Sequence, residues 1–279
     1  MKYSAFEKKK MYKSLCFSVI LGSIILHAAE WKNIPYYEKN FPIQGNKAAL
    51  QERCKLDIKT PNRKGFPTLI WFHGGGLSRG GKFYPEHLDT TKIGVVAVNY
   101  RLSGKNVRHP DYIYDAAAAV SWVLNNIEKY GGDAKKIFVS GHSAGGYLTA
   151  MVALDKKYLK TFGHSPKELA GFYPVSGQMS THFQILAERR KSDPGTPDFS
   201  IDDYAPLRHA SADAPPMIFF CGDPAVEWPA RVEENQLLAA RLKYVYKHQE
   251  IKFISIPLAG HGGCLPPSIA IINRLLKRK

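Results

Sequence analysis

Short apolar runs that stop at glycine or proline alternate along this chain with segments in which apolar residues recur at helical spacing. The runs typical of strands lie at 54–61, 66–76, 94–102, the start of 136–154, 168–177, 215–222 and 251–257. The helical segments lie at 111–131, the end of 136–154, 231–245 and 266–279. Strands and helices in such alternation form right-handed βαβ units. The sequence therefore predicts an α/β fold, with a mostly parallel central sheet and helices on both of its faces.

Residues 178–214 interrupt this alternation. The segment is polar and rich in proline, and we expect at most one short helix in it. Long insertions between strands are more often functional or mobile than structural. We therefore expect a single domain over 30–279, in which 178–214 forms a small cap-like insertion.

The amino-terminal segment is typical of a secretory signal peptide. Basic residues at 8–13 precede an apolar run at 15–26 and then small residues at 28 and 29. The run is shorter than the roughly 20 residues that a membrane-spanning helix needs. We expect a signal peptide over 1–29, a secreted or periplasmic protein and no stable membrane span after cleavage. The alternative is an uncleaved membrane anchor.

Basic residues exceed acidic residues, and the formal net charge is +15. The densest basic groups, at 61–65 and 275–279, have no aromatic residues among them. Nucleic-acid-binding surfaces concentrate basic and aromatic residues. We expect a dispersed, solvated basic surface suited to an anionic polysaccharide or membrane, and no nucleic-acid partner.

The cysteines beyond the amino-terminal segment are Cys54, Cys221 and Cys264. Three cysteines cannot all pair within one chain, and no C-x-x-C spacing suggests a metal site. The apolar surroundings of Cys221 favour a small buried side chain. One disulfide is compatible with an exported protein, but the sequence does not identify the pair.

The sequence GHSAGG at 141–146 lies between an apolar strand and a helix. A serine in this context can occupy a strained turn, with its hydroxyl at the carboxyl end of the sheet, provided that its neighbours are small. Ser143 is the candidate nucleophile, because the pattern has the strand–turn–helix setting that a nucleophile elbow requires.

A second glycine-rich motif, HGGG at 73–76, follows an earlier buried strand. Such a loop can direct main-chain N–H groups toward the carbonyl oxygen of a substrate. We predict an oxyanion hole from the N–H groups of Gly75, Gly76 and Ala144. The alternative is a tight turn without a ligand, since glycine marks turns in general.

A nucleophilic serine needs a base, and His261 follows the last expected strand on a loop flanked by glycines. His73 is expected to support its own loop, and His142 faces another direction in the turn beside Ser143. The acid that orients the histidine is expected after the strand at 215–222, where Asp223 and Glu227 both qualify. Either carboxylate could instead belong to the amino terminus of the following helix.

Four segments, WFHGGGLSRGGK, AVNYRL, GHSAGG and AGHGG, occur here in the order found in the α/β-hydrolase superfamily. Residues 50–279 resemble its HGGG-bearing esterases, in the hormone-sensitive-lipase-like and carbohydrate-esterase-like branches. The resemblance implies an α/β-hydrolase fold and a serine esterase that acts through an acyl-enzyme without a metal or other cofactor. The short chain and small cap look like acetyl xylan or feruloyl esterases, with a small or polysaccharide-linked ester as substrate.

One position departs from the family pattern. The family's acid usually occupies the place held here by Ala225. The distance along the chain to His261 favours Glu227, whereas the D-x-x-V pattern favours Asp223. We favour Glu227 and keep Asp223 as the alternative.

Two other functions compete with ester hydrolysis. A peptidase or amidase could use the same fold, although prolyl peptidases usually carry a large extra domain for which this chain has no room. A non-catalytic binding protein is the third hypothesis, to which the displaced acid gives weight. Tyr147, Trp228 and residues of 178–214 are candidate walls of the substrate pocket, with core packing as the alternative role.

Overall fold

The computed structural model describes residues 28–37 and 46–278 of the 279-residue chain. The expected signal peptide lies outside these residues, except for Ala28 and Ala29. Ala29 already belongs to the first strand. The proposed cleavage therefore stays a prediction.

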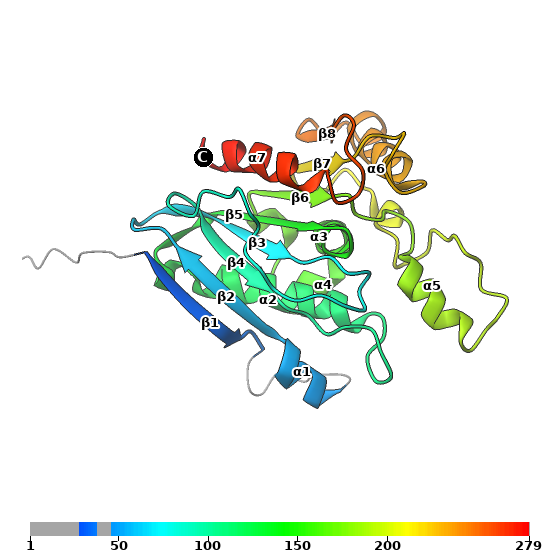
Figure 1. Ribbon diagram of the computed structural model, residues 1–279, viewed down its shortest axis with the longest axis horizontal. Helices are drawn as coiled ribbons and strands as arrows, with labels where there is room; N and C mark the ends of the chain where they lie inside the picture. Colours follow the sequence, from blue (N-terminus) through cyan, green and yellow to red (C-terminus); the bar gives the residue numbers. More distant parts are fainter. Residues whose placement is uncertain (1–27, 38–45, 279) are drawn as a thin grey trace, which may run out of the picture.

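One eight-stranded sheet forms the centre of the described part of the molecule (Figure 1). Its strands are β1 (Ala29–Pro35), β2 (Lys55–Thr60), β3 (Phe66–Phe72), β4 (Gly94–Val98), β5 (Gly132–His142), β6 (Gly171–Val175), β7 (Met217–Cys221) and β8 (Ile251–Ser255). The spatial order is β1-β2-β4-β3-β5-β6-β7-β8. β2 pairs antiparallel with β1 and β4, and all other pairs are parallel. The predicted fold class, with its mostly parallel sheet, is confirmed.

Helices cover both faces of the sheet. The α-helices are α1 (Lys47–Arg53), α2 (Asp111–Asn126), α3 (Ala144–Leu154), α4 (Lys157–Lys160), α5 (Phe183–Arg190), α6 (Arg231–Ala240) and α7 (Leu265–Leu276). The short helices are η1 (Ile127–Tyr130), η2 (Pro166–Glu168), η3 (Pro206–His209) and η4 (Arg241–Val245). α2, α3 and α6 share one hydrophobic cluster with the sheet, and α7 contributes to the cluster on the other face.

The central strand β3 explains why the sheet needs both layers. All seven of its residues are buried. Ile70 and Phe72 pack in the cluster of α2 and α3, whereas Leu69 and Trp71 pack in the cluster of α7. Successive side chains of a strand point to opposite faces, so a continuous apolar run is stable only when both faces are covered.

Two amino-terminal elements were not expected from the sequence. β1 is an edge strand whose residues are mostly exposed, so it has no apolar run. α1 is a short helix held at its start by the Asn46 side chain, which accepts hydrogen bonds from the N–H groups of Ala48 and Ala49. Both elements are stabilised by pairing or capping rather than by an amphipathic pattern.

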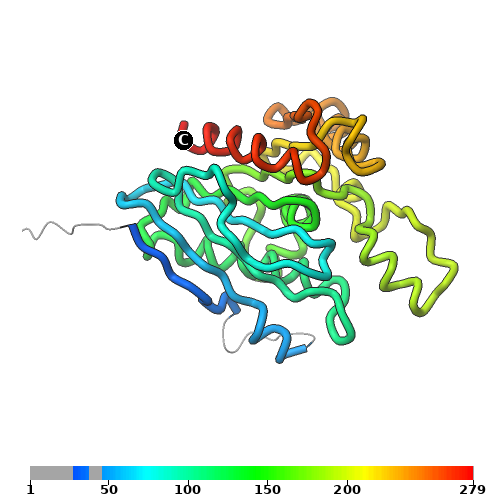
Figure 2. Tube along the Cα trace, in the orientation of Figure 1, coloured from blue at the N-terminus to red at the C-terminus, as the bar shows by residue number. Residues whose placement is uncertain are grey.

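Residues 178–214 leave the body of the molecule and return to it (Figure 2). They contain α5 and η3, one more short helix than expected. The division of the chain into one domain with a cap stays a prediction. We use the term cap for 178–214.

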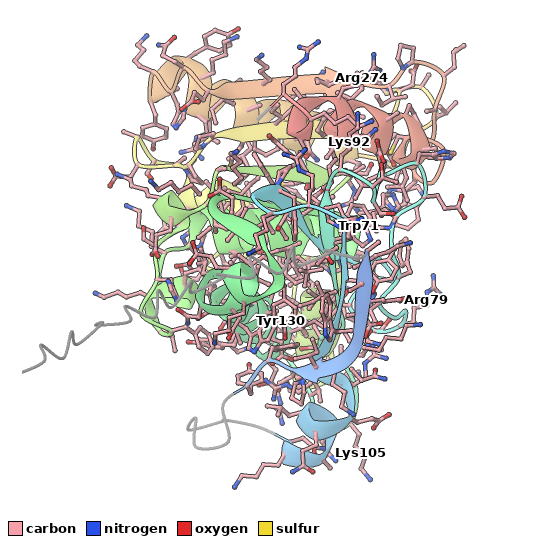
Figure 3. The ribbon with its side chains drawn as sticks, turned by 90° about the vertical axis from the view of Figure 1, so that its left-hand side faces the viewer. Trp71, Arg79, Lys92, Lys105, Tyr130 and Arg274 are labelled. Atoms are coloured by element: carbon pink, nitrogen blue, oxygen red, sulfur yellow. The ribbon has the colours of Figure 1, made fainter. Side chains whose placement is uncertain are left out.

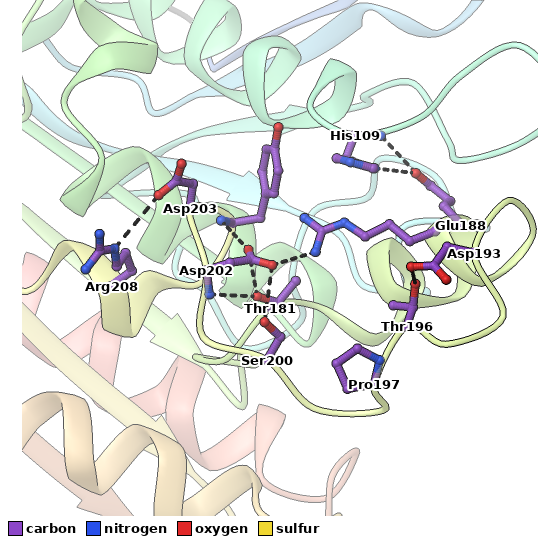
Figure 4. A network of polar contacts seen from close by, with 12 residues as sticks. His109, Thr181, Glu188, Asp193, Thr196, Pro197, Ser200, Asp202, Asp203 and Arg208 are labelled. Atoms are coloured by element: carbon purple, nitrogen blue, oxygen red, sulfur yellow. Dashed lines mark hydrogen bonds and ion pairs between the residues drawn. The ribbon is translucent and has the colours of Figure 1, made fainter.

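Polar contacts hold the cap together and attach it to the body of the molecule (Figure 4). Arg189 pairs with Asp202, which also accepts a hydrogen bond from Thr181 Oγ1 at 2.9 Å. The Glu188 carboxylate lies 2.9 Å from His109 Nδ1 and accepts the backbone N–H of His109 at 3.0 Å. The first pair closes the cap on itself, and the second ties α5 to the loop that precedes α2.

The basic residues are spread over the surface. Figure 3 shows Arg79, Lys92, Lys105 and Arg274 on separate parts of one side of the molecule.

Within 28–37 and 46–278, Cys54, Cys221 and Cys264 are free and buried. The same residues contain no group of histidine, cysteine and acidic side chains placed to hold a metal ion. None of the helices in this part of the chain is both long and apolar enough to cross a membrane.

Candidate active site

Ser143 sits in a sharp turn between β5 and α3. Its backbone has φ 57° and ψ −116°, a conformation that is strained for a residue with a side chain. The Ser143 N–H donates to the carbonyl oxygen of Val175 at 2.9 Å, which ties the turn to the end of β6. This geometry is the strand–turn–helix arrangement expected around the candidate nucleophile.

The glycines on either side of Ser143 are required by close packing. A Cβ atom at Gly145 would lie 2.1 Å from the carbonyl oxygen of Phe72. One at Gly141 would lie 2.6 Å from backbone atoms of Gly145 and from that same Phe72 oxygen. Any larger residue would force the turn away from β3, so the G-x-S-x-G spacing follows from sterics.

Ser143, His261 and Glu227 form a continuous chain of hydrogen bonds. Ser143 Oγ lies 2.9 Å from His261 Nε2, and Glu227 Oε1 lies 2.8 Å from His261 Nδ1. Ser143 and Glu227 are each only 8% exposed. An imidazole between a hydroxyl and a carboxylate can accept the hydroxyl proton while the carboxylate stabilises the imidazolium.

His261 lies on the loop between β8 and α7, and the backbone of this loop is held in place. Its carbonyl oxygen lies 2.7 Å from His142 Nε2 and accepts a bond from Cys264 Sγ at 3.3 Å. His142 is thus a support for the His261 loop. His73 Nδ1 lies 2.7 Å from the carbonyl oxygen of Gly74, as expected for a histidine that supports its own loop.

Glu227 is surrounded by hydrogen-bond donors. Oε1 accepts the backbone N–H of Trp228 at 2.8 Å, and Oε2 accepts the Gly222 N–H at 3.2 Å and the Ser176 hydroxyl. Burial alone would raise the pKa of Glu227, but the bonds from His261, Ser176 and Trp228 outweigh burial and lower it to about 2. The carboxylate is therefore ionised at neutral pH and keeps the His261 proton on Nδ1.

The alternative acid, Asp223, does not reach His261, so that assignment is wrong. Its carboxylate accepts the N–H groups of Leu258 at 2.8 Å and Ala225 at 3.0 Å. A tight turn, closed by the Glu227 N–H on the Asp223 carbonyl oxygen at 2.8 Å, brings Glu227 back over the end of β7. Asp223 joins the two loops that carry Glu227 and His261.

The HGGG loop lies directly beside Ser143. A Cβ atom at Gly74 would be 3.3 Å from the Cβ of Ser143. Gly75 and Gly76 have φ angles of 112° and 62°, which L side chains rarely adopt. Ala144 is the first residue of α3, and an N–H in the first turn of a helix has no partner within that helix. The three predicted oxyanion donors therefore lie on the two segments that flank the serine.

Tyr100, in the AVNYRL segment, supports the HGGG loop. Tyr100 stacks on the His73 ring at a centroid distance of 4.3 Å, and its hydroxyl donates to the His73 carbonyl oxygen at 2.9 Å. Arg101 forms a buried ion pair with Asp115 of α2 at 2.8 Å. The AVNYRL segment thus fixes the loop that carries the glycines.

Trp228 and Tyr147 occupy different environments, although both were candidate pocket walls. Trp228 is 46% exposed and stacks on the His261 ring, with centroids 3.8 Å apart and an angle of 11° between the planes. Tyr147 has no exposed surface, and its hydroxyl donates to the carbonyl oxygen of Tyr204 at 2.8 Å. Tyr147 is a core residue beneath the cap, so its assignment as a pocket wall is wrong.

The structure adds residues that the sequence motifs did not indicate. Ser176 follows β6 and donates to Glu227, a role suggested only by its place at the carboxyl end of a strand. Phe183, 41% exposed, begins α5 with its ring edge 3.1 Å from the position of a Cβ on Gly76. The start of the cap therefore overlies the HGGG loop.

The histidines that support the site make stability depend on pH. Burial lowers the pKa of His73 and of His142 from 6.5 to about 4. Below pH 6.5 the unfolded chain binds protons that the folded protein excludes, so stability falls as the pH falls from 6.5 toward 4.

We expect the free energy of unfolding to drop by about 2 kcal/mol for each of these two histidines between pH 7 and pH 5. Urea unfolding at the two pH values measures the drop, and His73→Gln should make it smaller. A stability that stays constant or rises on acidification would contradict the buried neutral state.

The mostly parallel sheet, the strained serine and the HGGG loop together give the α/β-hydrolase fold with the HGGG motif found in esterases. Residues 56–187 match the BD-FAE family. This match covers the HGGG loop, the serine turn and the beginning of the cap. The resemblance seen in the sequence motifs is confirmed.

Curated proteins that resemble the chain include esterases from several organisms. The probable carboxylic ester hydrolase LipM of Mycobacterium tuberculosis is 30% identical over 214 residues, which cover 70% of this chain and 49% of LipM. Carboxylesterase 1E of Rattus norvegicus is 29% identical over 172 residues, covering 55% of this chain and 29% of that protein. The chain spans about half the length of LipM and of esterase LipC of M. tuberculosis.

Solved structures share the fold at lower identity. A truncated carbohydrate esterase from gut microbiota superposes with a TM-score of 0.63 at 16% identity, covering 92% of this chain and 99% of that one. Thermogutta terrifontis esterase 2, phosphoramylated by tabun, gives a TM-score of 0.65 at 21% identity, covering 91% and 95%. Both similarities extend over more than nine-tenths of the chain.

Proposed function

We propose that this protein is a serine esterase that hydrolyses carboxylic ester bonds through an acyl-enzyme. The observation that carries the proposal is the unbroken hydrogen-bonded chain from Ser143 through His261 to the ionised Glu227. The esterases among its relatives and structural neighbours support the same reaction class.

In the first half of the reaction, His261 Nε2 accepts the proton of Ser143 as Oγ attacks the ester carbonyl carbon. The N–H groups of Gly75, Gly76 and Ala144 donate to the oxyanion of the tetrahedral intermediate. His261 then returns the proton to the leaving alcohol, and the acyl group stays on Ser143. In the second half, His261 takes a proton from water, whose oxygen releases the acid.

Glu227 and Trp228 act on the histidine. The Glu227 carboxylate keeps Nε2 free to accept the serine proton and stabilises the imidazolium that forms. The face of Trp228 stacks against the same ring, where its π electrons also favour the positive charge. Every proton in this scheme moves between side chains, substrate and water, so no metal or organic cofactor is needed.

We propose acetyl or feruloyl esters on plant polysaccharide as the substrate class. The match to the BD-FAE family and the similarity to a carbohydrate esterase of gut microbiota support this choice. Phe183, beside the HGGG loop, and Trp228, beside His261, both have exposed rings on which sugar or aromatic rings could stack.

We also propose that the protein is exported, to the outside of the cell or to the periplasm. The basic segment at 8–13 followed by the apolar run at 15–26 supports export. Fractionation of expressing cells tests this, and retention of the full-length protein in the cytoplasm would contradict it.

The reaction class is tested with 4-nitrophenyl acetate and 4-nitroacetanilide, which carry the same acyl group on an ester and on an amide. We expect turnover of the ester and much slower or no turnover of the anilide. Preferred cleavage of the anilide would instead indicate an amidase. Acetylated xylan and methyl ferulate, offered to the same preparation, then test the substrate class.

A further inference from the structure

Arg231 is a buried arginine next to the reacting groups, and the mechanism does not use it. It begins α6 and is only 6% exposed. Its guanidinium carbon lies 5.9 Å from the centre of the Trp228 ring, the ring that stacks on His261. The Trp228 ring therefore contacts both this charge and the histidine.

Two of the three guanidinium nitrogens lack a hydrogen-bond partner in the described part of the molecule. Nε and Nη1 are fully buried and have no hydrogen-bond partner among the described residues. A buried guanidinium without an acceptor is strongly unfavourable, because the water that solvated it has not been replaced. Two nitrogens of Arg231 therefore offer donors that no group of the described residues accepts.

The carboxylates that influence Arg231 are already engaged elsewhere. Glu227 is saturated by the donors described above. Glu234 accepts the N–H groups of Met179 and Ser180 at 2.7 and 2.9 Å, and the Ser180 hydroxyl at 2.7 Å. Neither carboxylate forms an ion pair with Arg231 in the described part of the chain.

The charge of Arg231 also acts on the start of the cap. Burial lowers the pKa of His182 well below its ordinary value, and the positive charge of Arg231 adds to that effect. His182 is 1% exposed and packs against Phe183, which lies over the HGGG loop. Arg231 therefore acts electrostatically on His182 at the start of the cap, and it contacts the Trp228 ring that stacks on the histidine of the triad.

We propose that Arg231 binds a carboxylate carried by the ester substrate and thereby selects for negatively charged esters. The proposal rests on the proposed esterase function and adds a requirement for charge, which acetyl or feruloyl esters meet only when the alcohol part carries the carboxylate. Guanidinium and carboxylate groups form two parallel hydrogen bonds, which would satisfy Nε together with a terminal nitrogen. The excess of basic over acidic residues also attracts anionic substrates to the protein.

The carboxylate could belong to the acid part or to the alcohol part of the ester, and two substrate pairs distinguish these sources. 4-Nitrophenyl hydrogen adipate and 4-nitrophenyl hexanoate test the acid part. 4-Acetoxybenzoate and phenyl acetate test the alcohol part. We expect the wild type to favour the anionic member of one pair in kcat/KM.

Arg231→Gln should lower kcat/KM for that anionic ester by about 10- to 100-fold, mainly through KM, because it removes charged hydrogen bonds. The neutral ester of the pair should change little. Arg231→Lys should restore part of the preference, since it keeps the charge without the planar fork. Arg274→Gln, at an exposed arginine of α7, controls for general charge and should leave the preference unchanged.

Equal losses for the anionic and neutral esters in Arg231→Gln, or no preference in either pair for the wild type, would overturn the proposal. If Arg231→Gln does not fold, competitive inhibition of wild-type phenyl acetate hydrolysis by free adipate or benzoate decides instead. Absence of this inhibition overturns the proposal.

A folded wild type that hydrolyses none of the four esters defeats the proposed esterase function. In that case, calorimetry would measure the binding of adipate to the wild type and to Arg231→Lys. Binding that is weaker in Arg231→Lys would still support the carboxylate site.

Discussion

Ser143→Ala is expected to lower kcat/KM for 4-nitrophenyl acetate by about 10⁴- to 10⁶-fold, because no other group can form the acyl-enzyme. The loss should appear in kcat, while KM changes little. The alanine should fold normally, since the serine side chain contributes only the bond to His261 and the strained turn is held by the Ser143 N–H on Val175.

The control for this variant is Ser192→Ala, at an exposed serine of the cap whose hydroxyl bonds only to the carbonyl oxygen of Arg189. It should keep wild-type activity. Steady-state kinetics and the circular dichroism spectrum of both variants make the comparison. Activity retained in a folded Ser143→Ala protein would remove the serine mechanism.

Glu227→Gln is expected to reduce kcat by about 10³- to 10⁴-fold. The amide has almost the shape of the carboxylate, but it cannot stabilise the imidazolium. Its NH₂ group can also donate to Nδ1, which would move the His261 proton to Nε2 and block the acceptance of the serine proton.

Two carboxylates serve as comparisons for Glu227→Gln. Glu233→Gln, exposed on α6, should have no effect. Asp223→Asn weakens one link between the loops of Glu227 and His261, and should reduce kcat by about 10-fold or less, as expected for the loss of one hydrogen bond. A larger loss in Asp223→Asn than in Glu227→Gln would reverse the assignment of the acid.

The sheet and the serine turn could be predicted because their causes are local in the sequence. β3 has a continuous apolar run, which indicates a strand buried on both faces. Gly141 and Gly145 indicate the turn because only glycine fits against Phe72. His261 was found in the same way, from its place on a loop after a buried strand.

The choice of acid could not be made from the sequence alone. Asp223 and Glu227 are neighbours on one loop, and what separates them is a turn that directs the first toward Leu258 and the second toward His261. Ser176 and the backbone of Gly222, which complete the environment of Glu227, come from other positions along the chain. Contacts of this kind depend on the folded arrangement of β6 and β7.

The surroundings of Tyr147 and of Arg231 could not be predicted from the sequence either. Tyr147 follows the serine motif, but the cap covers it completely. Arg231 belongs to an ordinary amphipathic segment, and it becomes notable only because the neighbouring carboxylates are bound to other donors. Whether a single side chain is buried, and whether its hydrogen-bonding groups have partners, depends on the tertiary structure.

The most direct test of the serine mechanism is mass spectrometry after treatment with a fluorophosphonate, in which the serine oxygen bonds to phosphorus and fluoride leaves. We expect one adduct per chain on the tryptic peptide 137–156, which contains Ser143. The adduct should be absent in Ser143→Ala and form much more slowly in Glu227→Gln. An unlabelled active protein, or an adduct at another residue with Ser143 unmodified, would contradict the mechanism.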